Sequence, residues 1–590
     1  MTIQKPKSLS ADRDSRQLID VALGREKADL AIVNGTILNV YTGEFLKDYA
    51  VGIKGKWVAY VGDDPQGLIG SETTVIDATG KTVIPGFIDG HAHITSPSHV
   101  NEYIRFAMKG GTTTLITETI EIVSTMGYEG VVEFLAATKD QPIKVFATAS
   151  ALLSISKKKP AIPQEALKKL LYRNDILGLG ESYWQWALKN PELVLPIYNE
   201  TLAFGKRLEG HSAGAKGKKL NAYVATGISS CHESITAEEV LERLRLGLHT
   251  MIREGSVRQE LAETAKIKDA GVDMRRLVLV TDGISPKDLK EKRCMEYVVQ
   301  KAIECGFDPV TAIRMASLNV AEHFAIDSVV GGIAPGKYAD MLIIPDPETI
   351  RPEYVISNGR IISAIGRRTV SPRQHTFSQE CRHTVRFNRN FEASDFAINF
   401  EGDRAEVRIM DMVTDLITKE TIMEITAADG EIKLDVAQDL LKIAAVDRTV
   451  VPGEYFVGLI RGFQMKSGAV ASSTSWDTVN IIIAGASEKD MAAAANRIFQ
   501  LQGGVVVCAH GEILAELPLP IFGIMTELPI DLTIERMAEI KKAAAGLGFP
   551  FPDPLLTLNT LTGAAVPFIR ICEEGYVNLK DGKTVGLFVN

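Results

Sequence analysis

Two histidines one residue apart, His91 and His93, are the first residues in the chain whose types and spacing could do chemistry. They follow the apolar segment PGFIDG. If this segment is a strand, side chains at positions i and i+2 lie on the same face, so both imidazoles can bind one metal ion. Asp89 lies one step further back on that face and is a candidate supporting group. The pair alone is a weak indication, because two unrelated histidines at a turn would look the same.

Further metal-competent side chains end several later strand-like runs. Glu181 follows ILGLG, His211 follows LEG, His232 follows TGISSC and Asp282 follows LVLVT. In a parallel barrel the carboxyl ends of the strands converge on one mouth, so these side chains should meet there. Six ligands are enough for two divalent ions that share a carboxylate and a water. The ions would activate this water as the nucleophile. Asp282 could take the proton of that water and pass it to the leaving group.

The ligand types do not select one metal. None of the six is cysteine, and nitrogen and oxygen ligation allows zinc, manganese or iron. We therefore predict a divalent-metal centre of unspecified metal, built from His91, His93, Glu181, His211, His232 and Asp282.

The pattern from residue 83 to about 330 predicts the framework that would position these ligands. Short apolar runs rich in Val, Ile and Leu alternate with helical stretches such as TAEEVLERLRLGLHTMIREG, residues 236–255. About eight strands over this length suit a (β/α)8 barrel. Within the helical stretch, Arg253 and Glu254 are expected to pair across a helix end rather than to contact substrate.

The rest of the chain divides into smaller units. Residues 1–27 are polar and are expected to form an arm or short helix. Residues 28–82 and 331–380 carry alternating strand patterns and should form the two parts of one small β unit. Residues 385–590 mix strands with amphipathic helices, which predicts an additional C-terminal α+β domain.

Composition excludes several classes of protein. The net charge is −9 and the isoelectric point about 5.7, which disfavours nucleic-acid and anionic-membrane partners. The six cysteines form no CxxC pair, and the N-terminal segment has no apolar core typical of a signal peptide. No apolar run reaches the length of a membrane span. These features predict a soluble cytoplasmic protein.

Longer segments resemble known families. PGFIDGHAHI resembles the signature of the amidohydrolase superfamily. ILGLGE, LVTDG, GGIAPGKYADMLII and the stretch from EGHSAGAKGKKLNAYV to TMIREGS resemble the bacterial adenine deaminases, in the same order. The C-terminal GFQMKSGAVASS and AELPLPIFGIM resemble that family's extra domain. The resemblance runs over nearly the whole chain from about residue 28.

This resemblance implies a (β/α)8 barrel, a small β-sandwich and a family-specific third domain. It implies two divalent ions per subunit, commonly manganese or iron, with Glu181 as the bridging carboxylate among the six ligands named above. The implied reaction is hydrolytic loss of ammonia from adenine, a small heterocyclic substrate, to give hypoxanthine. A homo-oligomer is also implied.

Two motifs depart from the family pattern. The family usually reads Asp-Pro-His-Glu where this chain has Glu118-Thr119-Ile120-Glu121, and His-Asp-Ser-His-Asn where it has Trp476-Asp477-Thr478-Val479-Asn480. We infer that these segments form a wall of the substrate pocket or an accessory metal site, here rebuilt with apolar and aromatic groups. Trp476 could stack on a flat ring or simply pack between domains. The candidate substrate contacts are Glu118, Glu121, Glu233, His99, Trp476 and Asp477.

Two rival functions stay open. The same centre could open a cyclic amide, imide or lactone, since both reactions begin with attack on an sp2 carbon. A non-catalytic binding role is disfavoured by the complete ligand set. Hydrolytic deamination of adenine or a substituted aminopurine is the leading hypothesis.

Overall fold

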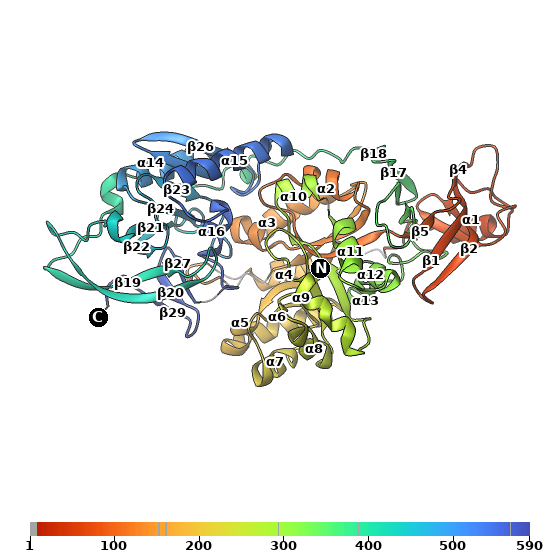
Figure 1. Ribbon diagram of the computed structural model, residues 1–590, viewed down its shortest axis with the longest axis horizontal. Helices are drawn as coiled ribbons and strands as arrows, with labels where there is room; N and C mark the ends of the chain where they lie inside the picture. The colour runs from red at the N-terminus through yellow and green to blue at the C-terminus, as the bar shows by residue number, and fades with distance from the viewer. Residues whose placement is uncertain are drawn as a thin grey trace.

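The computed structural model describes residues 9–150, 154–159, 162–292, 294–387, 389–566 and 568–589. Three blocks lie along its long axis, with the barrel between a small β unit and the C-terminal domain (Figure 1). Within the described ranges, no helix combines the length and the apolar character needed to cross a bilayer.

The central block is a closed ring of parallel strands. In the described chain these are β6 (Phe87–His93), β7 (Thr112–Thr117), β8 (Lys144–Ala149), β9 (Ile176–Tyr183), β10 (Arg207–His211), β11 (Ser230–Cys231), β12 (His249–Arg253) and β13 (Leu277–Val280) with its continuation β14 (Asp282–Gly283). Neighbours pair in parallel from β6 to β10 and from β11 to β13. The N–H of Ser229 donates to the carbonyl of Leu208 at 2.9 Å between β10 and β11. β14 pairs with β6 and closes the ring, which confirms the predicted (β/α)8 barrel.

Helices surround this ring and follow its strands. They include α2 (Val100–Ala107), α3 (Ile120–Thr138), α4 (Gln164–Leu171), α6 (Pro191–Ala203), α7 (Gly217–Val224), α8 (Ala237–Arg245), α11 (Met295–Glu304), α12 (Pro309–Met315) and α13 (Leu318–His323). Their buried faces and the strands share one continuous apolar core, with fully buried Phe87, Phe134 and Leu279 among its members.

The prediction of one long helix over residues 236–255 is wrong. Helix α8 ends at Arg245, and Gly247 follows with φ 83°, a left-handed conformation that ends a helix at little steric penalty. The apolar run after it is the barrel strand β12, whose residues Thr250 to Arg253 are all buried. Arg253 therefore stands at the carboxyl end of a strand and not at the end of a helix.

The small β unit is one sheet built from two distant parts of the chain. Its strands are β1 (Leu30–Asn39), β2 (Glu44–Lys54), β3 (Trp57–Gly62), β4 (Thr74–Asp77) and β5 (Thr82–Pro85), followed by β15 (Met341–Ile344), β16 (Tyr354–Ser357), β17 (Arg360–Ala364) and β18 (Arg367–Arg368). The antiparallel pairing of β5 with β15 joins the parts, with Ile84 opposite Leu342. Helix α1 (Ser15–Ala22) packs on this unit through Leu18 and Val21.

The C-terminal domain is a second mixed sheet with helices on it. Its strands are β19 (Arg404–Met412), β20 (Thr418–Thr426), β21 (Leu441–Val446), β22 (Tyr455–Arg461), β23 (Ala469–Ser472), β24 (Ile481–Gly485), β25 (Gly504–Ala509) and β26 (Glu512–Pro518). Helices α14 (Glu488–Leu501), α15 (Ile530–Gly546) and α16 (Pro554–Thr560) accompany it, together with a small sheet of β27 (Ile569–Cys572), β28 (Gly575–Asn578) and β29 (Lys583–Val585).

The segment 154–159, which follows β8, ties the barrel to this domain. Lys159 Nζ pairs with Asp447 at 2.7 Å, and both side chains are almost completely buried. The hydroxyl of Ser156 donates to Glu573 at 2.5 Å. These contacts hold the C-terminal domain against the mouth of the barrel.

Candidate metal centre

The six predicted ligands all stand at the carboxyl ends of barrel strands. His91 and His93 end β6, Glu181 lies near the end of β9, and His211 ends β10. His232 directly follows β11, and Asp282 begins β14. The strand ends bring them together because a parallel barrel gathers its carboxyl ends at one mouth.

Glu181 lies at the middle of this group. Its Oε1 is 3.1 Å from Nε2 of His93 and 3.3 Å from Nε2 of His91. Nε2 of His232 lies 3.7 Å from the same oxygen. One carboxylate oxygen thus faces three imidazole nitrogens, an arrangement that suits a carboxylate shared between metal sites.

Asp282 approaches His91 and His93 from β14, the strand paired with β6. Its Oδ1 is 3.5 Å from Nε2 of His93 and 3.7 Å from Nε2 of His91. Its backbone φ is 57°, an uncommon value for a residue other than glycine. This conformation carries the carboxylate inward at the point where β13 continues into β14.

His211 forms a second cluster with His232 and Glu233. Oε1 of Glu233 is 3.2 Å from Nε2 of His211 and 3.4 Å from Nε2 of His232. In the described chain the possible metal-holding groups are three overlapping sets, each with ligand atoms within 4.8 Å of one another: His91 with His93 and Asp282, His91 with Glu181 and His232, and His211 with His232 and Glu233. Glu233, predicted as a substrate contact, thus stands among possible ligands, and its position directly after His232 is the signal for this role.

The donor set fits divalent metal ions. Nε2 of His91 is buried and has no hydrogen-bond partner among the described residues. Nδ1 of His93 lies 2.8 Å from Glu121, and Nδ1 of His91 lies 3.4 Å from Glu118. Metal-ligating histidines commonly use a carboxylate in this way, which leaves the other ring nitrogen for the metal. The structure thereby places Glu118 and Glu121 against two predicted ligands.

Asp89 lies deeper in the barrel. Its carboxylate accepts hydrogen bonds from the hydroxyl of Thr281 at 2.5 Å and from the N–H of Thr281 at 3.2 Å. Burial raises its pKa to about 6. Asp89 therefore links β6 to β13, beneath the strand ends that carry His91 and Asp282.

The electrostatics keep the ligand carboxylates ionised. Burial alone would raise the pKa of Glu181, but the nearby imidazoles of His91 and His93 bring it well below its ordinary value. Burial and the nearby His91 lower the pKa of His232 to about 3. An ionised Glu181 and a neutral His232 are forms that bind a cation. Burial disfavours a proton on His91, but Glu118 and Glu181 raise the pKa of this histidine to about 10, so a cation bound there would replace that proton.

Arg253 lies in the candidate site, where the sequence analysis did not predict it. Its guanidinium is buried and donates to Oδ2 of Asp282 at 3.2 Å, to Glu233, and to Glu260 through two bonds of 3.1 Å. Burial opposes the charge of Asp282, but Arg253 lowers the pKa of that carboxyl below its ordinary value. The strand-like run HTMIR, ending in a polar residue like the other barrel strands, was the signal that could have identified Arg253.

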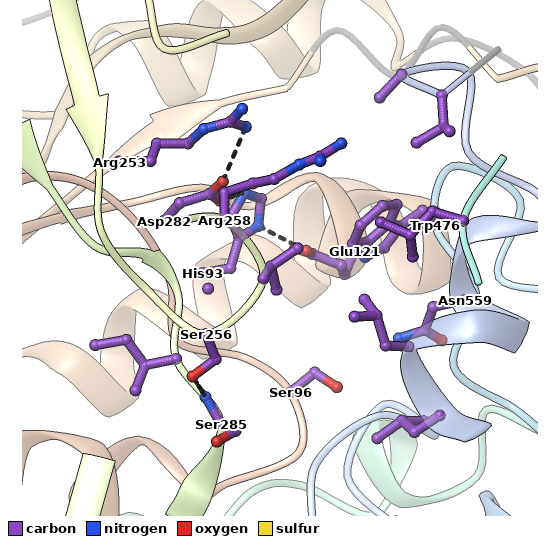
Figure 2. Close-up of a pocket in the computed structure, with 18 of the residues that line it drawn as sticks. His93, Ser96, Glu121, Arg253, Ser256, Arg258, Asp282, Ser285, Trp476 and Asn559 are labelled. Atoms are coloured by element: carbon purple, nitrogen blue, oxygen red, sulfur yellow. Dashed lines mark hydrogen bonds and ion pairs between the residues drawn. The ribbon is translucent and has the colours of Figure 1, made fainter. Parts of the chain in front are cut away.

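A cavity of about 200 Å³ opens beside these ligands. Figure 2 shows His93 beside Glu121, with Arg253 bonded to Asp282. Barrel residues line one side and C-terminal-domain residues the other. The C-terminal contribution is Leu416, Trp476, Asp477, Met537, Asp553, Leu555, Leu556, Asn559, Ala565 and Val566.

The predicted substrate contacts divide into two groups. Glu121, Glu233, Trp476 and Asp477 line the cavity, as does Ile120. Glu118 lies behind His91 and is not among the lining residues. His99 also does not line the cavity, because its Nδ1 accepts the N–H of Asn101 at the start of α2 and its ring packs on Phe377. This placement gives no support to a substrate contact by His99.

Comparison with known proteins agrees with this architecture. Residues 82–362 match the amidohydrolase family, and residues 415–583 match the adenine deaminase C-terminal domain. A protein named adenine deaminase from Moorella thermoacetica is 35% identical over 590 residues, covering 97% of this chain and 98% of the relative. One of the same name from Cenarchaeum symbiosum is 35% identical over 579 residues, covering 96% and 94%.

Solved structures are more distant. The β-aspartyl dipeptidase of Fervidobacterium islandicum AW-1 superposes with a TM-score of 0.47 at 17% identity, over 60% of this chain and all of that protein. The long, nearly end-to-end similarity to the two relatives above is therefore the informative one. On that similarity, the chain belongs to the adenine deaminase family, with an amidohydrolase barrel followed by the adenine deaminase C-terminal domain.

Proposed function

We propose that this protein is a metal-dependent hydrolase that deaminates adenine or a substituted aminopurine. The observation that carries the proposal is the cluster of four imidazoles with Glu181 and Asp282, of which all but His91 line one cavity. The proposal draws its substrate from the relatives named adenine deaminase, which match nearly the whole chain.

Two divalent ions per subunit are part of this proposal. His91, His93 and Asp282 would hold one, His211 and His232 the other, with Glu181 between them. Divalent ions there would supply Lewis acidity that makes water a nucleophile near neutral pH. Manganese or iron is the family expectation, and the nitrogen and oxygen ligands also suit zinc.

The side chains of the cavity would handle the protons of the reaction. Asp282, kept ionised by Arg253, would accept a proton from the attacking water and give a proton to the departing amine. The new carbon–oxygen bond forms as water adds to the ring carbon, and the carbon–nitrogen bond to the amine breaks to release ammonia. The C-terminal wall would limit access of bulk water to the reacting carbon.

The setting of the reaction is also proposed. The cysteine pattern and acidic charge support a cytoplasmic enzyme with a small-molecule substrate and neither a nucleic-acid nor a membrane partner. Family resemblance supports a homo-oligomer.

The test is product formation by manganese-loaded protein supplied with adenine, N6-methyladenine and a panel of aminopurines. Ammonia release is measured together with the ultraviolet spectrum of the product, so that loss of methylamine is also detected. We expect turnover that Asp282→Asn abolishes while the protein stays folded. No product from any aminopurine at full metal occupancy would overturn the proposal and direct the search to cyclic amides, imides and lactones.

A further inference from the structure

The wall that faces the metal centre is mainly hydrocarbon. The C-terminal domain presents the apolar side chains of Leu416, Trp476, Leu555, Leu556 and Val566 to the cavity. Figure 2 shows Trp476 on this side, across from His93. Such a surface can cover the faces of a planar ring, but it cannot select a ring by its nitrogen atoms.

Three polar residues interrupt this apolar wall, and two of them have local structural tasks. Asp553 is the N-cap of α16, where its carboxylate accepts the N–H of Leu556 at 3.0 Å. The side-chain oxygen of Asn559 accepts a hydrogen bond from the hydroxyl of Thr474. Asp477 is the third, and it alone of the three bonds to a barrel residue.

Asp477 is joined to the strand that carries Glu181. The hydroxyl of Tyr183 donates to Oδ1 of Asp477 at 3.1 Å, and the N–H of Ala564 donates to Oδ2 at 2.5 Å. Tyr183 lies two residues after Glu181 on β9, and its ring meets the ring of His211 edge-on at 4.9 Å. The carboxyl of Asp477, which lines the cavity, is thus fixed by one contact from each domain.

The loop that carries Asp477 is held in a strained conformation. Asp477 has φ 60° and Val479 has φ 49°. A left-handed conformation is unusual for a β-branched residue such as Val479. The carbonyl of Val479 accepts a 2.8 Å hydrogen bond from the buried guanidinium of Arg448, and the hydroxyl of Ser124 on α3 donates to the carbonyl of Asp477 at 3.4 Å. Strain that is kept in place by buried contacts is characteristic of ligand-binding segments.

Burial adds a chemical property to this position. It raises the pKa of Asp477 to about 7, against the opposing hydrogen bonds from Ala564 and Tyr183. Near neutral pH the carboxyl can therefore donate a hydrogen bond when it is protonated and accept one when it is ionised. A nitrogen heterocycle presents both kinds of partner, as unprotonated ring nitrogens and as ring N–H groups.

We propose that Asp477 is the specificity-determining residue of this site, and that its carboxyl hydrogen-bonds a ring nitrogen of the substrate on the edge turned away from the metal centre. Tyr183 is its positioning residue, and the apolar neighbours contact the faces of the ring. The substrate class is then a planar heterocycle with a ring nitrogen on that edge. This inference rests on the proposed function for the identity of the reacting group, but the binding contact can be measured without any reaction.

The test uses full-length, manganese-loaded protein and purine, which has the ring nitrogens but no amino group to lose. Binding of purine is measured by calorimetry for wild type, Asp477→Asn, Asp477→Ala, Tyr183→Phe and the double variant of Asp477→Ala with Tyr183→Phe, with metal content determined for each. The matched control is Asp490→Asn, since Asp490 is also a buried aspartate of the C-terminal domain that accepts a backbone N–H, from Gly511, away from the cavity. Kinetics with adenine are recorded for the same proteins.

We expect Asp477→Ala to weaken purine binding at least about tenfold, the loss of one hydrogen bond to a charged or strongly polar partner. Asp477→Asn should lose less, and Tyr183→Phe should have no further effect once Asp477 is alanine. Asp490→Asn should bind as wild type does, and all variants should keep their metal. The loss should appear in KM more than in kcat for adenine.

The outcomes separate this inference from the proposed function. Unchanged purine binding and KM in Asp477→Ala would overturn the inference and leave deamination standing. Binding of purine that depends on Asp477, without turnover of any aminopurine, would support the inference and overturn deamination. Failure of wild type to bind purine would overturn the inference, and turnover of adenine would still decide the proposed function.

Discussion

One Nη of Arg253 lies 3.2 Å from Oδ2 of Asp282, while the rest of the guanidinium is held by Glu260 through two hydrogen bonds of 3.1 Å. Glu260 therefore fixes the plane of the guanidinium, and Arg253 in turn fixes the carboxylate of Asp282. Oδ1 of Asp282 faces the imidazoles of His91 and His93, whereas Oδ2 accepts the hydrogen bond from Arg253. This division orients the carboxylate that is proposed to move protons.

Arg253→Ala should lower kcat/KM by about 100-fold, because hydrogen bonds to charged groups contribute about 1.5–3 kcal/mol and the buried carboxylates would lose their counter-ion. Arg253→Lys should recover only part of this, since an ammonium group cannot reproduce the planar fork. Steady-state kinetics at fixed metal content measure both. Arg245→Lys, on the exposed side of α8, is the control. Wild-type activity in Arg253→Ala would contradict the role given to this pair.

Glu121→Gln should weaken manganese binding about 10- to 100-fold, because the carboxylate on Nδ1 of His93 sets the orientation and basicity of that ligand. Calorimetric titration of metal-free protein gives the affinity directly. Glu129→Gln, exposed on the same helix, should bind as wild type does. Equal affinities of the two variants would show that Glu121 has no part in holding the metal.

The buried carboxyl of Asp477 should make the stability of the metal-free protein depend on pH. Its pKa is raised to about 7 in the folded chain, so between its unfolded value near 4 and pH 7 the folded state holds a proton that the unfolded state has lost. Stability therefore falls as pH rises over this interval and levels off above it. Asp477→Asn lacks this dependence, and its stability relative to wild type should rise by about 3 kcal/mol between pH 5 and pH 8.

Unfolding of metal-free wild type and Asp477→Asn at both pH values measures this difference. Metal-free protein is used because bound cations would shift the equilibrium of a nearby carboxyl. If wild type and Asp477→Asn differ in stability by the same amount at pH 5 and at pH 8, Asp477 titrates as an exposed aspartate does.

Lys159→Met should destabilise the protein by about 3–5 kcal/mol, because it leaves the carboxylate of Asp447 buried without its partner. The matched control is Lys158→Met, whose ion pair with Glu454 is partly exposed, and it should change little. Denaturant unfolding followed by fluorescence compares the two. Joint replacement of Lys159 and Asp447 by apolar residues should recover much of the loss, and no recovery would indicate that packing around Lys159 matters more than its charge.

The meeting of the candidate ligands at one mouth could be predicted from the sequence because they repeat one local rule. Each of Glu181, His211 and Asp282 ends an apolar run, and parallel strands place such residues at one mouth. The barrel followed from the same runs. The one barrel strand that was missed, β12, follows α8 in a continuous pattern of apolar and charged residues. Only Leu246, the left-handed Gly247 and Leu248 separate the two elements.

Contacts between distant segments could not be predicted in the same way. The bonds from Tyr183 to Asp477 and from Lys159 to Asp447 join residues almost 300 positions apart, and no periodicity encodes them. The partners of Arg253 could not be predicted, because the expected helix over residues 236–255 placed Arg253 outside the barrel strands. His99 carried a plausible residue type close to the metal ligands, but its local hydrogen bond to the N–H of Asn101 turns it into a helix cap.

The cavity between two domains also bears on how such an enzyme can diversify. All of the proposed metal ligands belong to the barrel, whereas the facing wall is encoded more than 130 residues further along the chain, from Leu416 onward. A mutation in that wall can change which ring is accepted while the ligands keep their positions. Selection can therefore explore new substrates in one module while the other module preserves the catalytic chemistry.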